Sequence, residues 1–477
     1  MKTKQQRIEN EQKGIMDSIT RRDFLKVSGA VTLVALGGGQ LLNIPEVVAA
    51  RPGPTTRNSL YIPPIVSPSG LTLTEAPATV NVGGGTMASV WAYNNSLPGP
   101  TIIASQGSTA SINLVNGLSQ ETITHWHGMI VDGLNDGHPK YAIPPGGTKN
   151  YNFAINQRAA LNWYHPHTHM LTNEQVAMGL AGAFIVTDNE ESALGLPSGN
   201  YQVPLVVRDA SFDAAYNMVY RSGGGDTPMV NGTLNPYLEV DTARYRFRVL
   251  SGAQNRIFGL ALSNGAPFTL IGNDGGLLET SVPGLTQIDL APAERADIII
   301  DFRGLPVGSS IMLKDLRTGW DLLEFRVTRT VTDTGTTPTA LSTITKLSNP
   351  VRTRVFNFEG MSRINGQVYD INRIDFQVPF GETELWRFTT KGAAPHPVHI
   401  HGASFQIQSR TGGRGQLFPW EQGWKDTVLL DDGETVEILI RFDQFRSVGG
   451  DGKGLYLIHC HRLEHEDNGM ISNFEVV

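Results

Sequence analysis

The sequence predicts an all-β fold made of three β-sandwich units. The chain has 477 residues, and at roughly 150 residues per domain this length suits three domains. Charged residues make up 17% of the chain, below the typical ~25%, so long charged helices should be scarce. The 52 glycines and 27 prolines predict frequent turns. Short strands joined by many turns fit all of these observations.

Residues 1–50 have the features of a twin-arginine export signal. Arg21 and Arg22 precede the residues DFLK and then an apolar stretch over residues 27–42. Ala49 and Ala50 would suit a cleavage site. Because the apolar stretch is short and interrupted by glycines, we expect no membrane span after processing. We therefore expect the twin-arginine export machinery as a partner, and a periplasmic or extracellular location.

Two polar, turn-rich segments divide the rest of the chain, one near residues 187–200 and one over residues 328–345. They predict three units, at residues 51–188, 200–328 and 346–477. In the middle unit, residues 245–250 alternate between apolar and polar side chains, and residues 296–302 form a more continuous apolar run. These patterns are typical of strands with one or two buried faces.

The charge balance and the cysteine count narrow the possible functions. The formal net charge is -7, which argues against nucleic acid or an anionic membrane as partner. We therefore expect a small-molecule substrate. Cys460 is the only cysteine, so the chain cannot form an internal disulfide. A buried, inert thiol is the default interpretation of such a residue, but its neighbours favour another.

Histidine placement is the most informative feature of the sequence. If the twelve histidines were scattered at random, about 0.3 His-x-His pairs would be expected. Five pairs occur, within residues 125–127, 165–169, 399–401 and 459–461. Chance does not explain them.

Strand geometry gives these pairs a meaning. Side chains alternate between the faces of a strand, so residues i and i+2 point the same way and can bind one metal ion or two adjacent ones. His459 and His461 should share one face, while Cys460 points to the other. His396 lies three positions before His399, so it should fall on the face opposite His399 and could join Cys460.

The residues around Cys460 are typical of a copper site. One thiolate, two imidazoles and a weak axial Met are the ligand set of blue copper, and Cys460, His465 and Met470 lie in one short segment. Zinc also accepts Cys and His, but structural zinc sites close with four strong ligands and rarely include Met. Eight other imidazoles, one pair from each of the four histidine segments, have no thiolate to share, which suits copper that binds and reduces dioxygen.

The four histidine segments resemble the copper-binding signatures of the multicopper oxidases, in particular three-domain bacterial laccase-like proteins. The resemblance covers nearly all of the chain after residue 50. Further motifs resemble the family's first domain at residues 97–102 (LPGPTI), and its second at residues 230–232 (VNG) and 291–296 (APAERA). The resemblance implies three cupredoxin-like Greek-key β-barrel or sandwich domains. It also implies a trinuclear copper cluster between the first and third domains, held together by the middle one.

Carried over to this chain, the family pattern implies four copper ions. The type 1 copper would be held by His396, Cys460, His465 and Met470. The type 2 copper would be held by His125 and His399. The type 3 pair would be held by His127, His165, His167, His401, His459 and His461. His138 and His169 remain unassigned, and we expect solvated or supporting roles for both.

Three further residues are implied in catalysis. Cys460 would pass electrons from the type 1 copper to the cluster, because His459 and His461 are its covalent neighbours. By resemblance, Glu466 and Asp136 match acidic positions that deliver protons, although solvated loop carboxylates are the alternative for both. We expect a structural role for Asp467. Asp426 could line the donor pocket or be a buried structural carboxylate.

The resemblance implies a laccase-type oxidase, which couples four one-electron oxidations of phenols or aromatic amines to reduction of dioxygen to two waters. A metallo-oxidase acting on Cu(I), Mn(II) or Fe(II) is the alternative. Cuprous oxidases tend to carry a Met-rich insertion, yet only Met312 and Met361 lie between Met229 and Met470. An electron carrier would not need the cluster histidines, and a copper-free structural relative would have lost ligands. We expect a monomer.

Overall fold

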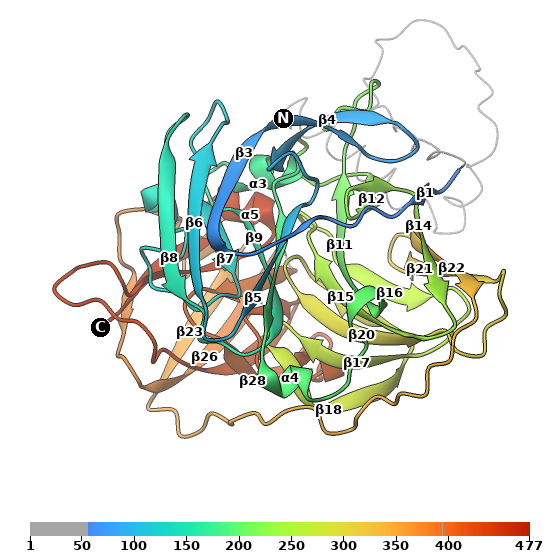
Figure 1. Cartoon of the computed structure of the whole chain (residues 1–477). Helices are drawn as coiled ribbons and strands as arrows, with labels where there is room; N and C mark the ends of the chain where they lie inside the picture. Colours follow the sequence, from blue (N-terminus) through green and yellow to red (C-terminus); the bar gives the residue numbers. More distant parts are fainter. Residues whose placement is uncertain (1–55, 394) are drawn as a thin grey trace, which may run out of the picture. The chain divides into compact units, whose positions relative to one another are not determined.

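The structure is a computed structural model that describes residues 56–393 and 395–477. The expected export signal, residues 1–50, lies outside the described residues. Strands make up 48% of the described residues and helices 6%, which confirms the all-β prediction. Figure 1 shows the strands along the described part of the chain. Within the described residues, no helix is long and apolar enough to cross a membrane.

Two sheets enclose the first core, which contains Trp126, Tyr151 and Phe184. Parallel pairing of β3 with β6 and of β5 with β10 makes both sheets mixed. The four-stranded sheet has the order β4 (Met87–Tyr93), β3 (Ser69–Asn81), β6 (Thr109–Asn116), β8 (Thr148–Ala154). The five-stranded sheet has the order β2 (Ile65–Val66), β5 (Gly99–Ser105), β10 (Gly182–Thr187), β9 (Ala160–Pro166), β7 (Thr124–His127).

The middle of the chain forms a second pair of sheets around a core that includes Phe247, Phe302 and Phe325. One sheet has the order β1 (Asn58–Ser59), β14 (Pro236–Asp241), β22 (Asp321–Arg329), β21 (Ser310–Asp315), β16 (Phe258–Leu262), β19 (Ile288–Leu290). The other has the order β13 (Thr233–Leu234), β12 (Thr227–Val230), β11 (Gln202–Ala210), β15 (Arg244–Ser251), β20 (Arg295–Asp301), β17 (Phe268–Asn273), β18 (Gly276–Leu285). Strand β1 therefore pairs with the middle of the chain, although it lies in the range 51–188.

The last part of the chain repeats this arrangement around Trp386, Phe388 and Phe474. The side chains of β26 alternate between the core and a partly exposed face. Because only one face of this strand is buried, a second sheet packs on that face to form a β-sandwich. One sheet has the order β24 (Arg363–Ile364), β23 (Arg352–Glu359), β26 (Thr383–Lys391), β30 (Thr435–Arg441), β28 (Phe405–Thr411). The other has the order β25 (Phe376–Val378), β32 (Ile471–Val476), β31 (Leu455–Cys460), β27 (His396–Ile400), β29 (Thr427–Leu430).

The helices are short and lie in connections. They are η1 (Pro139–Tyr141), α3 (Thr172–Ala177), α4 (Asn189–Ser192), η2 (Gly199–Tyr201), η3 (Pro419–Glu421) and α5 (Leu463–Asp467). Helix α4 lies in the polar segment near residues 187–200, where Asp188 accepts a hydrogen bond from the Glu191 backbone N–H. Glu191 in turn pairs with Arg246 and Arg248 of β15. Both faces of β15 are therefore buried, although its alternating sequence predicts only one apolar face.

Two of the family-like motifs meet where the first and middle parts of the chain touch. Gly232 has φ +69, and an added Cβ there would lie 2.1 Å from the backbone oxygen of Leu97. Any side chain at Gly232 would therefore push the LPGPTI and VNG motifs apart. A small apolar cluster, which includes Trp163, Leu250 and Ala293, fills the same junction.

Candidate metal centres

The first two histidine pairs lie on neighbouring strands. Strand β7 pairs antiparallel with β9, and His125 lies directly opposite His165. His127 ends β7, and His167 follows the last residue of β9. All four side chains are at most 1% exposed. Cross-strand pairing and the two-residue period therefore gather these imidazoles on one face at the end of the sheet.

The other two pairs are arranged in the same way in the last part of the chain. Strand β27 pairs antiparallel with β31, which places His399 opposite His459 and Val398 opposite Cys460. His401 and His461 lie just beyond the strand ends. These four histidines are also at most 1% exposed.

The two sets of histidines come together across the contact between these sheets. The His125 and His401 rings stack with centroids 3.9 Å apart, and the His127 and His399 rings stack at 3.7 Å. His459 Nε2 lies 3.1 Å from His401 Nε2 and 3.3 Å from His167 Nε2. The eight imidazoles, His125, His127, His165, His167, His399, His401, His459 and His461, thus form one buried group, here called the histidine cluster.

Cys460 faces away from the histidine cluster and lies with two other histidines. Its Sγ is 3.6 Å from His396 Nδ1 and 3.6 Å from His465 Nδ1, and the two Nδ1 atoms are 3.2 Å apart. Met470 is fully buried, and backbone hydrogen bonds join it to Cys460 and His465. One strand therefore presents Cys460 on one side and His459 and His461 on the other.

The donor atoms of the histidine cluster fit metal binding. His125 and His399 each donate Nδ1–H to a backbone carbonyl, of Asp136 and Asp426 respectively, while their Nε2 atoms have no hydrogen-bond partner among the described residues. His165 does the same with the carbonyl of Pro166. His127 is reversed, because its Nε2 contacts Asp426 and its Nδ1 lacks a partner within the described ranges. Buried ring nitrogens without partners, aimed at one another, suit a cation.

Burial also shifts the pKa values of these side chains. Burial lowers the pKa of His165 to about 3 and of His167 to about 4. At the second site, burial lowers the pKa of His396 to about 4 and raises that of the Cys460 thiol to about 12. The imidazoles of His165, His167 and His396 are therefore neutral and able to ligate at pH 7, whereas the thiol needs a bound cation to lose its proton.

Asp136 lies against the histidine cluster. Its Oδ2 is 2.6 Å from His401 Nδ1, and its backbone carbonyl accepts from His125. Burial raises its pKa well above the usual range. Gly137, at φ +87, lets the loop pack on β7, because an added Cβ would lie 2.3 Å from the Thr124 carbonyl oxygen. The solvated-loop alternative for Asp136 is wrong, since the side chain is fully buried.

Glu466 lies on another side of the histidine cluster. Its carboxylate is 3.2 Å from His459 Nδ1 and 3.6 Å from His167 Nδ1, and it is 1% exposed, so it is not a solvated loop carboxylate either. Burial alone would raise its pKa, but the neighbouring His167 and His459 lower it to about 2. The next residue, Asp467, accepts hydrogen bonds from the backbone N–H groups of Thr172 and Asn173. Asp467 thus fixes α5 to the start of α3.

The structure locates several residues whose positions the sequence pattern does not determine. Asp426 contacts His127 and is buried, so it belongs to the histidine cluster and not to a donor pocket beside Cys460. His138 is buried and accepts from the Lys140 backbone N–H, whereas His169 is half-buried beside Tyr369. Arg295 and Arg462 are absent from the sequence-based site. Arg295 does lie in the APAERA motif, which offers a signal for it.

Comparison with known proteins agrees with this geometry. Two family models, both described as multicopper oxidase, match residues 75–191 and 336–477. A laccase of Bacillus subtilis is 30% identical over 469 residues, which cover 81% of this chain and 90% of the laccase. The cell division protein FtsP of Shigella dysenteriae is 32% identical over 459 residues, covering 90% and 93%.

A solved structure gives the same result for the fold. The McoA multicopper oxidase of Aquifex aeolicus has a TM-score of 0.81 and 34% identity, and the match covers 88% of this chain and 99% of that one. The cupredoxin-like architecture implied by the sequence motifs is therefore confirmed. Both family models extend over the strands that carry the histidines, and the chain belongs to the multicopper oxidase family, as a copper oxidoreductase that uses dioxygen.

Proposed function

We propose that the chain is a laccase-type oxidase of phenols or aromatic amines. Four donor molecules each lose one electron, and dioxygen takes up four electrons and four protons to give two waters. The observation that carries the proposal is the division of the buried donors into a thiol-containing site and a histidine cluster, which share β31. A one-electron donor needs such an entry site, separate from the place where dioxygen is reduced.

We propose four copper ions per chain. His396, Cys460, His465 and Met470 hold the type 1 copper, and His125 and His399 hold the type 2 copper. The type 3 pair is held by His127, His165, His167, His401, His459 and His461. Copper bound by these residues supplies one-electron transfer and the reduction of dioxygen. A copper-free structural role is disfavoured because such a relative would have lost ligands, whereas every expected ligand is present and buried.

Two carboxylates would supply protons to the histidine cluster. Asp136 and Glu466 are buried and touch different histidines of the cluster. Asp136, whose pKa is raised by burial, would hold a proton at pH 7, whereas Glu466, whose pKa is lowered to about 2, would take up a proton from solvent and pass it on. Cys460 connects the two groups of ligands through its covalent neighbours His459 and His461.

Arg462 favours organic donors over metal cations. Its backbone N–H lies 3.4 Å from Cys460 Sγ, and its positive charge contributes to the lowered pKa of both His396 and His465. The side chain is partly exposed, and its Nε has no hydrogen-bond partner among the described residues. A positive charge beside the entry site repels Cu(I), Mn(II) and Fe(II), does not repel uncharged phenols and aromatic amines, and attracts anionic organic donors.

A charge series at Arg462 tests the donor class. We expect kcat/KM for an anionic organic donor to fall about tenfold for each unit of charge removed, from Arg462 through Arg462→Gln to Arg462→Glu, as Coulomb energies at this range allow. The values for Mn(II) and Fe(II) should rise, and Arg462→Lys should resemble the wild type. If both donor classes change in the same direction, Arg462 does not select the donor.

The activity itself is tested on copper-loaded protein. We expect four copper ions per chain, a donor-to-dioxygen ratio of four, and higher kcat/KM for a phenol or an aromatic diamine than for Cu(I), Mn(II) or Fe(II). One copper per chain would indicate an electron carrier, and none a structural protein. Faster turnover of a metal ion would favour the metallo-oxidase.

Export and oligomeric state complete the proposal. The sequence of residues 1–50 supports twin-arginine export to the periplasm or the exterior. Replacing Arg21 and Arg22 by lysines should keep the protein in the cytoplasm, as fractionation would show. We propose a monomer, which light scattering of the mature protein would test.

A further inference from the structure

The APAERA motif of the middle part of the chain reaches the histidine cluster through Arg295. Arg295 begins β20 and is 1% exposed. Its Nη1 donates to Asp426 Oδ1 at 2.7 Å, and its Nη2 pairs with Asp426 Oδ2. The planar guanidinium thus grips both oxygens of one carboxylate, an arrangement that fixes its orientation as well as its charge.

The remaining donors of Arg295 are also used. Nε donates to the Leu161 carbonyl of β9 at 2.9 Å, Nη1 to the Ala293 carbonyl at 2.9 Å, and Nη2 to the Asp274 carbonyl at 3.1 Å. Leu161 lies on the strand that carries His165. One buried side chain from the middle of the chain therefore bonds to a ligand-bearing strand and to Asp426.

Asp426, whose orientation Arg295 fixes, contacts two histidines of the cluster. Its Oδ1 lies 3.1 Å from His127 Nε2, and its backbone oxygen accepts from His399 Nδ1 at 2.8 Å. Thr427 Oγ1 donates to Asp426 Oδ1 at 2.9 Å. A carboxylate can only accept, so His127 carries its proton on Nε2 and keeps Nδ1 free. His127 is thereby turned the opposite way from His125, His165 and His399.

A second buried cation, Lys425, pairs with two other carboxylates near Arg295. Lys425 Nζ lies 2.9 Å from Asp274 Oδ2 and 3.1 Å from Glu294 Oε1, and all three side chains are at most 2% exposed. Lys425 therefore offsets part of the charge of these two carboxylates, and Arg295 Nη1 also lies 3.6 Å from Asp274 Oδ1. Replacing Arg295 by a neutral residue would leave the buried Asp426 carboxylate without its paired positive charge, which is strongly destabilising.

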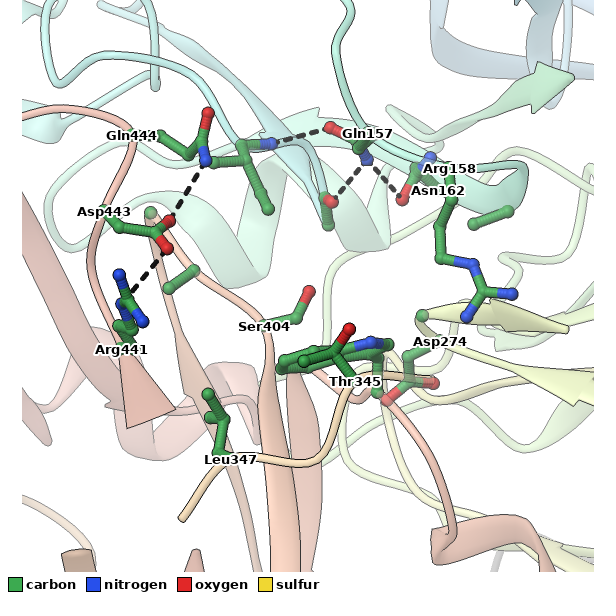
Figure 2. Close-up of a pocket in the computed structure, with 17 residues that line it drawn as sticks. Gln157, Arg158, Asn162, Asp274, Thr345, Leu347, Ser404, Arg441, Asp443 and Gln444 are labelled. Carbon is green, nitrogen blue, oxygen red and sulfur yellow. Dashed lines mark hydrogen bonds and ion pairs between the residues drawn. The ribbon is translucent and has the colours of Figure 1, made fainter. Parts of the chain in front are cut away.

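A cavity of about 370 Å³ lies nearby, and Figure 2 shows side chains that line it. The cavity is lined by residues of all three parts of the chain, including Gly128, Asn162, Asp274 and Ser404. Gly128 has φ +86, and an added Cβ would lie 2.8 Å from Arg295 Nη2 and 2.9 Å from Asp426 Oδ2. The Arg295–Asp426 pair thus forms the layer between this cavity wall and His127. Arg158, labelled in Figure 2, lines the same cavity but pairs with Glu190.

We infer that Arg295 is a positioning residue for the type 3 and type 2 ligands, acting through Asp426 on the orientation and tautomer of His127 and His399. The middle part of the chain therefore contributes to the geometry of the histidine cluster, although it supplies no ligand. This inference rests on the copper assignment proposed above. It also gives the APAERA motif a specific role.

The test compares Arg295→Met, Arg295→Lys and Asp426→Asn with Arg158→Met, which removes an arginine from the same cavity without touching Asp426. The measurements on copper-loaded protein are copper per chain, the electron paramagnetic resonance and near-ultraviolet absorption of the cluster coppers, the blue absorption of the type 1 copper, and thermal stability. We expect Arg295→Met and Asp426→Asn to weaken cluster copper binding about 10- to 100-fold, the usual effect of losing a supporting partner of a ligand. The blue absorption should be unchanged.

The pattern across variants separates positioning from general stability. Arg295→Lys keeps the positive charge but cannot donate to both oxygens of Asp426, so the signals of its cluster coppers should be intermediate. Arg158→Met should match the wild type. If Arg295→Met does not fold, Arg295→Lys and Asp426→Asn decide the question. Normal cluster signals in folded variants of lower thermal stability would overturn the inference and leave the oxidase proposal intact. A wild-type protein that binds no copper would instead defeat the proposed function.

Discussion

At the scale of single residues, Cys460 is the side chain on which the entry site depends. Its Sγ lies between two imidazoles, and its chain neighbours belong to the histidine cluster. Burial disfavours its ionised form, so only a bound cation stabilises the thiolate. The neighbours of the thiol therefore support its proposed role as a metal ligand over that of a buried, inert cysteine.

Replacing Cys460 by serine separates the two groups of ligands. Cys460→Ser should abolish the blue thiolate-to-copper absorption and essentially all turnover, because a hydroxyl is too weakly acidic to replace the thiolate. Copper analysis should give three ions per chain instead of four, since the histidine cluster is intact. A blue and active Cys460→Ser protein would contradict the assignment of the entry site.

Glu466 allows proton supply to be tested apart from electron supply. Glu466→Gln keeps the shape of the side chain but cannot carry the ionisable proton. In stopped-flow experiments, anaerobic bleaching of the blue band by donor should proceed at the wild-type rate. Reoxidation by dioxygen should slow by about 10²-fold or more, the scale of general acid catalysis.

The control for Glu466 is the second buried carboxylate. If both phases slow equally in Glu466→Gln, the residue holds the loop of His465 and has no role in proton supply. If neither phase changes, Asp136 is the remaining candidate, and the same two measurements on Asp136→Asn decide its role.

At the scale of elements, a buried histidine holds the loop that carries Asp136. His138 caps η1, where its Nδ1 accepts from the Lys140 backbone N–H, and its Nε2 donates to Asn473 Oδ1 of β32 at 3.0 Å. Asn473 is itself fixed by donating to the carbonyls of Asp370 and Arg373. These bonds require a neutral imidazole, and burial lowers the pKa of His138 to about 3.

His138 therefore predicts part of the acid sensitivity of the fold. Its pKa is depressed in the folded state, so below the unfolded value of about 6.5 the unfolded chain binds a proton that the folded chain does not. Stability should fall as the pH drops from about 6.5 toward 3. Between pH 7 and pH 5 this group should account for about 2 kcal/mol of the free energy of unfolding.

Denaturant unfolding of His138→Gln measures this contribution. The loss of stability between pH 7 and pH 5 should be about 2 kcal/mol smaller in the variant than in the wild type. The half-buried His169 provides the matched control, and His169→Gln should change the pH dependence much less. An unchanged pH dependence in His138→Gln would mean that the histidine is not neutral in the fold.

At the scale of the whole molecule, the histidine cluster joins the first and last parts of the chain. His125 and His127 come from β7, whereas His399 and His459 come from β27 and β31. In the absence of a cation, their inward ring nitrogens have no hydrogen-bond partners among the described residues or face one another. Metal binding should therefore stabilise this contact as well as catalyse the reaction.

Removing copper tests this coupling. Chelation should lower the thermal midpoint, and readdition of copper should restore it, because a ligand that binds only the folded state adds about 4 kcal/mol per site at a thousandfold excess over Kd. Cys460→Ser, which keeps the cluster coppers, should lose only a small part of this stabilisation. Equal midpoints with and without copper would show that the contact does not depend on the metal.

The division into units at residues 51–188, 200–328 and 346–477 stays a prediction. The six sheets formed by the described residues fall into three pairs along the chain, which supports it. The pairing of β1 with β14 shows why a boundary drawn from composition is imprecise, because a two-residue strand carries no periodic signal.

The sequence by itself determined the all-β fold class and the grouping of the histidines. Both follow from local rules: turn residues mark strand ends, and the two-residue period of a strand places His459 and His461 together and Cys460 opposite. The structure has this arrangement. Only the tertiary structure decided that His127 turns its Nε2 toward Asp426, and that Arg295 holds Asp426 from 131 positions away in the chain. These contacts join sheets distant in sequence, and they depend on how the cores pack, which no local pattern encodes.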